Sequence, residues 1–90
     1  MKKYTVIIEP KAQKQLKKID PIQSKMIQKW ILKNLVNCSE PCFQGKMLKG
    51  NLKSIWRYRV GQYRIFAEID RECIVIKIIK IGHRQSVYND

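Results

Sequence analysis

The pattern of hydrophobic and polar positions changes period along this chain, and each change marks an expected element. The segment "YTVIIE" is rich in β-branched residues and continuously apolar in its middle, which predicts a short buried strand over residues 3–9. After Pro10 the apolar positions Ala12, Leu16 and Ile19 recur at offsets of four and three. This spacing places them on one stripe of a short helix that is otherwise rich in lysine.

A second, longer helix is predicted directly after Asp20 and Pro21. An aspartate can cap the free N–H groups of a first helical turn, and a proline fills the first position, which needs no donor. The apolar face of this helix comprises Ile22, Met26, Ile27, Trp30, Ile31 and Leu35. The two helices are therefore expected to form a hairpin with a shared apolar side.

The second half of the chain predicts a loop followed by strands with a two-residue period. Residues 37–54 are interrupted by proline and glycine, which indicates a loop. Alternating side chains beyond it predict strands over residues 55–60 and 63–69, joined by a turn at Gly61 and Gln62.

A third strand, "CIVIKIIKI" over residues 73–81, is mostly apolar, which suits a central strand covered on both faces. Gly82 is expected to end it. The order of elements predicts an α+β fold: an N-terminal strand, a helical hairpin and a three-stranded antiparallel meander. The hairpin would cover one face of a four-stranded sheet, and residues 1–90 would form a single domain.

The stretch "SIWRYRVGQYRIF" concentrates arginines on the other face of that sheet. Strand alternation places Arg57 and Arg59 opposite the core-facing Trp56 and Tyr58, and the next strand adds Arg64. A buried, unpaired guanidinium is costly, so the arginines are expected to line the open face. Guanidinium groups suit phosphate oxygens, although solvated residues that keep a basic protein soluble remain the alternative.

The charge of the chain favours a polyanionic partner. Nineteen lysines and arginines oppose seven acidic residues, for a formal net charge of +12. Nucleic acid is the leading candidate, and an acidic protein would fit the charge equally well. No apolar run approaches the roughly 20 residues that span a bilayer, and no export signal is visible, so we expect a cytoplasmic protein. Cys38, Cys42 and Cys73 lack metal-site spacing, so no metal or cofactor is expected.

The segment "WRYRVGQYRIFAEID", the apolar strand after it and "IGHRQSVY" resemble the RelE/ParE superfamily of toxins from type II toxin–antitoxin systems. The likeness is closest to the RelE-like ribonuclease branch, and the order of elements and the loop "KMLKG" agree with it. The resemblance implies a RelE-like fold and a toxin that enters the ribosomal A site and cleaves mRNA there. It also implies neutralisation by a cognate antitoxin that covers the basic face.

The same resemblance assigns roles to residues that match the family pattern. Arg57 and Arg59 stand where such enzymes keep basic catalytic residues, and Arg64 matches the arginine that stabilises the scissile phosphate. Arg84 and Tyr88 match an active-site arginine and a tyrosine that stacks on or orients the substrate base.

A basic loop is the predicted RNA-binding segment. Lys49 matches a family residue that helps to hold RNA, and Lys46 and Lys53 are neighbouring candidates. Basic loops are also commonly just solvated.

The proton transfers of RNA cleavage need a group other than arginine. Attack of a 2′-OH on the adjacent phosphate requires a proton acceptor, a proton donor and charge stabilisation, and arginine is a poor base. His83 carries the only imidazole and is the predicted general acid or base, although family members vary between lysine and histidine there. Its alternative is a structural histidine.

Two other functions stay open: a ParE-like poison of DNA gyrase and a non-catalytic RNA-binding module. Presence of the arginine and tyrosine set favours the ribonuclease, since the gyrase-directed branch tends not to keep it. Trp30 and Trp56 fall on inward faces, so core packing is predicted for both rather than base stacking.

Overall fold

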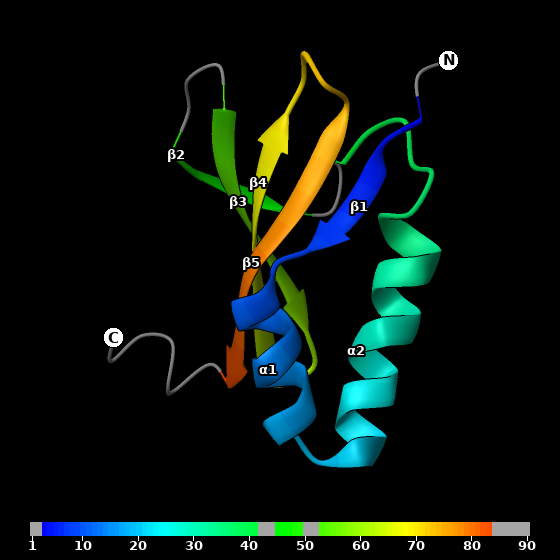
Figure 1. Ribbon diagram of the computed structural model, residues 1–90, viewed down its shortest axis with the longest axis vertical. Helices are drawn as coiled ribbons and strands as arrows, with labels where there is room; N and C mark the ends of the chain where they lie inside the picture. Colours follow the sequence, from blue (N-terminus) through cyan, green and yellow to red (C-terminus); the bar gives the residue numbers. More distant parts are fainter. Residues whose placement is uncertain (1–2, 42–44, 50–52, 84–90) are drawn as a thin grey trace.

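The computed structural model describes residues 3–41, 45–49 and 53–83, which form two helices and a five-stranded sheet (Figure 1). The elements, in chain order, are β1 (Thr5–Ile8), α1 (Pro10–Lys18), α2 (Pro21–Asn34), β2 (Lys46–Lys49), β3 (Lys53–Val60), β4 (Tyr63–Asp70) and β5 (Val75–His83). The strand order across the sheet is β1-β5-β4-β3-β2. The predicted α+β class and order of elements are confirmed.

The sheet contains one strand more than the four that were predicted. β3, β4 and β5 form the expected antiparallel meander, while β1 joins β5 in parallel at one edge. β2 adds an antiparallel strand beside β3 at the other edge, within the segment that predicted only a loop. Four residues between glycines are too few to show a two-residue period, so this strand is recognised only by its pairing with β3.

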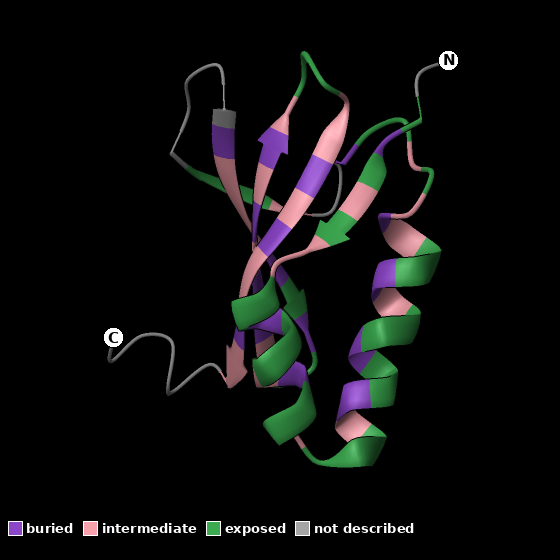
Figure 2. Ribbon diagram, viewed as in Figure 1, coloured by how far each residue is buried: buried purple, intermediate pink, exposed green. Residues whose placement is uncertain are grey.

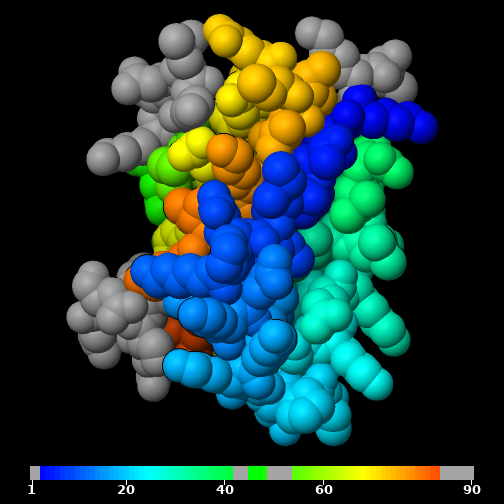
Figure 3. Space-filling model, viewed as in Figure 1, coloured from blue at the N-terminus to red at the C-terminus, as the bar shows by residue number. Residues whose placement is uncertain are grey.

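The helices begin at the two prolines, as predicted. The Oδ2 atom of Asp20 accepts hydrogen bonds from the backbone N–H groups of Ile22, at 3.1 Å, and Gln23, at 3.4 Å, which caps α2. Figure 3 shows α1 and α2 side by side over the lower part of the molecule. Only Ile19 and Asp20 separate the end of α1 from the start of α2, so the two helices form a tight hairpin.

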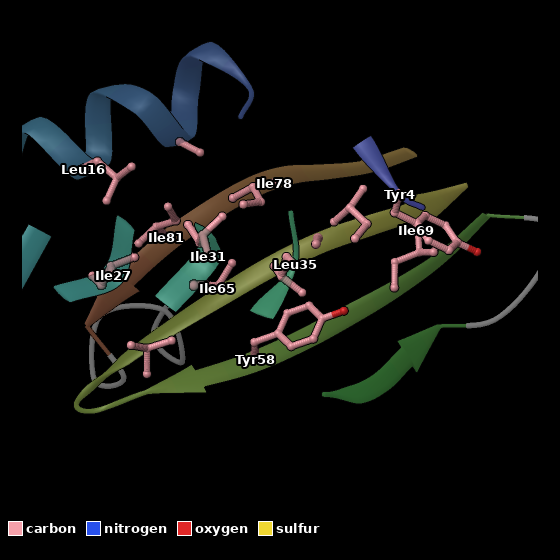
Figure 4. Packing of buried hydrophobic residues seen from close by; sticks show 14 residues of the cluster. Tyr4, Leu16, Ile27, Ile31, Leu35, Tyr58, Ile65, Ile69, Ile78 and Ile81 are labelled. Atoms are coloured by element: carbon pink, nitrogen blue, oxygen red, sulfur yellow. The ribbon is translucent and has the colours of Figure 1, made fainter. Parts of the chain in front are cut away.

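The core lies between this hairpin and the sheet, as Figures 2 and 4 show. Buried and partly exposed residues alternate along β4, so that Ile65, Ala67 and Ile69 are fully buried. Tyr58 of β3 is also fully buried, and the ring of Trp30 from α2 packs against it at a centroid distance of 5.5 Å. Trp30 and Trp56 both pack against the core, in agreement with the sequence.

The prediction that β5 is covered on both faces is wrong. Ile76, Ile78 and Ile81 are buried, whereas Lys77 and Lys80 are half-buried on the other side of the strand. A register shift between Ile78 and Lys80, opposite the step from Phe66 to Ala67 of β4, inserts one extra residue, Ile79. Because of the bulge, the spacing of inward residues changes from two, between Ile76 and Ile78, to three, between Ile78 and Ile81. The sequence of the strand therefore reads as a nearly continuous apolar run although only one of its faces packs against the helices.

Gly82 does not end β5, which continues to His83. β1 pairs with β5 only from Val75 to Ile78, so α1 replaces it as the neighbour of the last part of β5. The backbone N–H of Ile81 donates to Oε1 of Gln15 over 2.7 Å. This contact satisfies a strand donor that has no β1 partner and fixes α1 against the end of β5.

Candidate functional site

The strand register brings like charges together on the face of the sheet away from the helices. Lys46 of β2 lies directly opposite Arg57 of β3, and Arg59 of β3 lies directly opposite Arg64 of β4. Like charges in such cross-strand pairs destabilise a sheet. Two adjacent pairs of cations therefore indicate a surface selected for something other than stability.

These four residues, Lys46, Arg57, Arg59 and Arg64, form what we call the cationic face. Lys46 and Arg59 are exposed and Arg57 is half-buried, as expected for the open side of the sheet. Arg64 shares this face but is only 6% exposed, so it lies deeper in the sheet than Arg57 and Arg59, the two arginines that were predicted to line the open face. Its Nη1 donates to the backbone oxygen of Tyr63 at 3.4 Å. Because a guanidinium below the surface is surrounded by less water, its electrostatic attraction to an anion is stronger than that of an exposed guanidinium.

A shallow hollow of about 270 Å³ lies on the cationic face. Gly45, Lys46, Arg57 and Arg59 line it. Gly45 allows close approach, because a Cβ atom at this position would lie 2.6 Å from Cε1 of the Tyr58 ring. A hollow with three cationic side chains suits a phosphate group of a nucleic acid.

Two further side chains belong to this face and were not among the predicted site residues. Phe66 of β4 lies between Arg57 and Lys80, its partners on the two flanking strands. Phe66 shares the strand parity of Arg64, which was a usable signal in the sequence. Lys80 was hidden by the bulge in β5, because simple alternation from Ile78 places residue 80 on the helix side.

His83 does not lie with the arginines. It pairs with Tyr63, and the two residues share the helix-facing side of the sheet with Ile65 and Ile81. The rings of His83 and Tyr63 meet edge to face at a centroid distance of 5.5 Å. The structure therefore brings Arg57 and Arg59 together and places the predicted acid or base on the opposite side of the sheet.

The remaining predicted residues are placed only in part. Lys49 pairs with Ile55 at the end of β2, and Lys53 pairs with Asp70 at the start of β3; only their backbones are described. Arg84 and Tyr88 lie outside the described residues.

No group of three or more His, Cys, Asp or Glu side chains that could hold a metal ion occurs within residues 3–41, 45–49 and 53–83. Cys73 is an exposed thiol. In the same part of the chain, neither helix has the length and apolar character needed to cross a membrane.

Comparison with known proteins decides the family. Residues 6–88 match the family described as the ParE toxin of type II toxin–antitoxin systems, parDE. The chain belongs to this toxin family. The superfamily that the strand and C-terminal motifs suggested is thereby confirmed.

Individual relatives agree with this assignment. The toxin RelG of Mycobacterium tuberculosis is 29% identical over 85 residues, which cover 94% of this chain and 95% of RelG. The toxin–antitoxin complex RelBE2 from the same organism contains a chain with 29% identity and a TM-score of 0.79, covering 92% of this toxin and 100% of that chain. The archaeal RelE–RelB complex from Pyrococcus horikoshii shares the fold at 23% identity, with a TM-score of 0.78 and coverage of 92% and 97%.

Proposed function

We propose that this toxin is a metal-independent, ribosome-dependent endoribonuclease that cleaves mRNA in the A site and so inhibits translation in the cytoplasm. The observation that carries the proposal is the cationic face, where two cross-strand pairs of like charges adjoin a hollow lined by three cationic side chains. Such a face favours a ligand that brings negative charge, because the ligand relieves the repulsion between the paired cations.

The reaction is an attack of the ribose 2′-oxygen on the adjacent phosphorus, with loss of the 5′-oxygen of the next nucleotide. The bond from phosphorus to the 2′-oxygen forms and the bond to the 5′-oxygen breaks, which leaves a 2′,3′-cyclic phosphate and a 5′-OH. A base accepts the 2′-OH proton, and an acid protonates the leaving oxygen. Negative charge accumulates on the phosphate oxygens between these two events.

The cationic face supports the stabilisation of that charge. Arg57 and Arg59 line the hollow with Lys46, and Arg64 lies directly across from Arg59. We assign Arg57, Arg59 and Arg64 to the phosphate oxygens of the transition state, and Lys46, Lys49 and Lys53 to the RNA backbone on either side.

His83, Arg84 and Tyr88 are the candidates from the sequence for the two proton transfers. His83 would have to turn round the end of β5 to reach the cationic face, because its ring packs against Tyr63 on the helix side. An incomplete acid–base set fits an enzyme that relies on the ribosome to align the 2′-oxygen for attack.

A cognate antitoxin is the proposed protein partner. The solved structures with the same fold include toxin–antitoxin complexes from Mycobacterium tuberculosis and Pyrococcus horikoshii. A net charge of +12 favours an acidic partner that binds through charge complementarity.

A gyrase poison is the second candidate, because the matching family is described by its ParE toxins. Expression of the wild type and of Arg64→Ala in a bacterium, with primer extension on an abundant mRNA, separates the two. Cleavage within translated codons by the wild type, reduced by about 100-fold or more in Arg64→Ala, is expected if Arg64 stabilises the transition state. Growth arrest with intact mRNA and a DNA-damage response would instead identify gyrase as the target.

A further inference from the structure

The bulge in β5 turns one lysine onto the cationic face at a definite place. Ala67 of β4 pairs with Ile78 of β5. Phe66, one residue earlier, pairs with Lys80 and not with Ile79. Simple alternation from Ile78 would turn residue 80 toward the helices. Bulges are frequent next to active sites, where they re-aim a side chain, and this one places Lys80 directly across from Phe66.

This pairing completes a row of side chains across four strands. Lys46 of β2, Arg57 of β3, Phe66 of β4 and Lys80 of β5 are successive partners in the register of neighbouring strands (Figure 1). Adjacent strands lie about 4.8 Å apart, so the backbones of Arg57 and Lys80 are separated by roughly 10 Å, with Phe66 midway. The row therefore presents an aromatic ring with a cationic side chain on either side of it.

Phe66 differs in placement from the other phenylalanine, tyrosine and tryptophan residues that the structure describes. Those residues belong to the core or pack against it: Tyr4, Trp30, Trp56, Tyr58 and Tyr63. Phe66 lies on the opposite side of β4 from the fully buried Ala67 and is itself half-buried. Packing of the core thus does not account for an aromatic side chain here. A partly exposed ring on a sheet surface can instead stack on an unpaired RNA base.

The two lysines on this side of β5 differ in their cross-strand partners. Lys77 lies opposite Glu68, and such a pair of opposite charges stabilises a sheet. Lys80 lies opposite Phe66, in the row that contains Arg57. Both lysines are half-buried. The sheet itself therefore gives Lys77 a structural role, whereas the position of Lys80 suits an anion that lies beside the ring of Phe66.

We propose that Phe66 and Lys80 form a nucleotide subsite. One nucleotide of the RNA would stack its base on Phe66, with one of its two flanking phosphates in the hollow beside Arg57 and the other at Lys80. The proposal rests on the function proposed above and deepens it, because it says how the substrate strand lies on the cationic face. The RNA would cross the strands of the sheet along the row, and a strand held on both sides of one base is better aligned for attack.

RNA binding by the purified toxin tests the stacked base. The probe is a short, labelled single-stranded RNA in which 2′-O-methyl groups replace the 2′-hydroxyls, so that it cannot be cleaved. Phe66→Leu keeps an apolar side chain but removes the aromatic face, so its Kd should rise by about 5- to 100-fold. Phe66→Trp should bind within about threefold of the wild type.

Abasic probes test the same contact without altering the protein. In a series with the abasic residue at each position in turn, one position should weaken binding by the wild type by a similar factor. That probe should bind the wild type and Phe66→Leu equally. Equal affinity of the wild type for every member of the series would overturn the proposal.

Salt dependence tests the phosphate at Lys80. Lys80→Gln removes one cation, so the slope of log affinity against log salt concentration should become less steep by about 0.7, whereas Phe66→Leu should leave the slope unchanged. Lys77→Gln is the matched control, because it changes a half-buried lysine of the same strand and side. It should alter the Kd by no more than about twofold. Equal effects of Lys77→Gln and Lys80→Gln would mean general charge attraction and would overturn the phosphate contact.

Primer extension in a bacterium that expresses the same variants separates this subsite from the proposed reaction. If the wild type binds the probes as expected but cleaves no mRNA, the ribonuclease proposal fails and the subsite stands. If the wild type cleaves mRNA while Phe66→Leu and Lys80→Gln bind and cleave as it does, the subsite is refuted and the reaction stands. Absence of any binding by the wild type at low salt would also refute the subsite.

Discussion

On β5, Ile76 and Ile78 point toward the helices, whereas Lys77 and Lys80 point to the other side of the sheet. The same division runs through β3, where Tyr58 is fully buried and Arg59 is exposed. Burial of one large apolar side chain stabilises a fold by about 1.5–3 kcal/mol, and a like-charge cross-strand pair costs roughly 0.2–1 kcal/mol. The apolar side chains buried on the helix-covered face can therefore offset the cost of the like-charge pairs on the cationic face.

The largest effect on stability should come from an inward position of β5. Ile78→Ala removes a fully buried side chain, so we expect the free energy of unfolding to fall by about 2–5 kcal/mol. Lys80→Ala, two residues later on the opposite face, should change it by less than about 1 kcal/mol. Urea unfolding with an unchanged m value measures both. Similar losses of unfolding free energy in the two variants would contradict the view that the helix-covered face supplies the stability and the cationic face does not.

The next effect on stability concerns Gly45, which lines the hollow on the cationic face and lies close to the buried ring of Tyr58. A Cβ atom at Gly45 would come within 2.6 Å of the buried Tyr58 ring and 3.0 Å of the backbone oxygen of Arg57. Since Tyr58 is fully buried and its hydroxyl donates to the backbone oxygen of Pro41, the ring has little room to move. Gly45→Ala should therefore destabilise the fold by about 1–3 kcal/mol and displace Lys46 from the hollow.

Thermal unfolding and RNA affinity of Gly45→Ala test both parts of this expectation. The exposed Gln62→Ala in the β3–β4 turn is a control that should alter neither quantity. Wild-type stability in Gly45→Ala would show that β2 can shift without strain.

An effect of similar size, or smaller where water reaches the site, is expected at the contact between α1 and the end of β5. Gln15→Met keeps the length of the side chain but removes the oxygen that accepts the N–H of Ile81. A strand donor left without this acceptor should cost about 1–3 kcal/mol, less where water reaches it. Gln13→Met on the same helix is the matched control, because the exposed Gln13 donates to the oxygen of Ile8 at the edge of the molecule. Native-state hydrogen exchange at Ile81 should accelerate only in Gln15→Met.

The sequence was sufficient where one pattern determined one element. The two prolines and the apolar stripes predicted both helices, and alternation predicted which side of β3 carries Arg57 and Arg59. It failed where placement depends on pairing with a distant strand. β2 has too few residues to show a period, and the bulge in β5 is defined only by its partner Phe66. The side of the sheet that carries His83 follows from that bulge, so local sequence could not supply it.

His83 gives the finest test of the difference between the faces, because the sequence assigns it to catalysis and the structure places it against Tyr63. An edge-to-face aromatic pair contributes about 0.5–1.5 kcal/mol, so His83→Gln should lower stability by that amount. Since the ring lies on the helix side, we expect cleavage at permissive temperature to change by only about twofold. Primer extension and thermal unfolding of the same variant, with Tyr63→Leu as the matched control, measure the two effects. Tyr63→Leu removes the other ring of the pair and should give the same small loss of stability with the same near-normal cleavage. If His83→Gln instead retained full stability and lost about 100-fold or more in cleavage, the imidazole would act as the acid or base after turning round the end of β5.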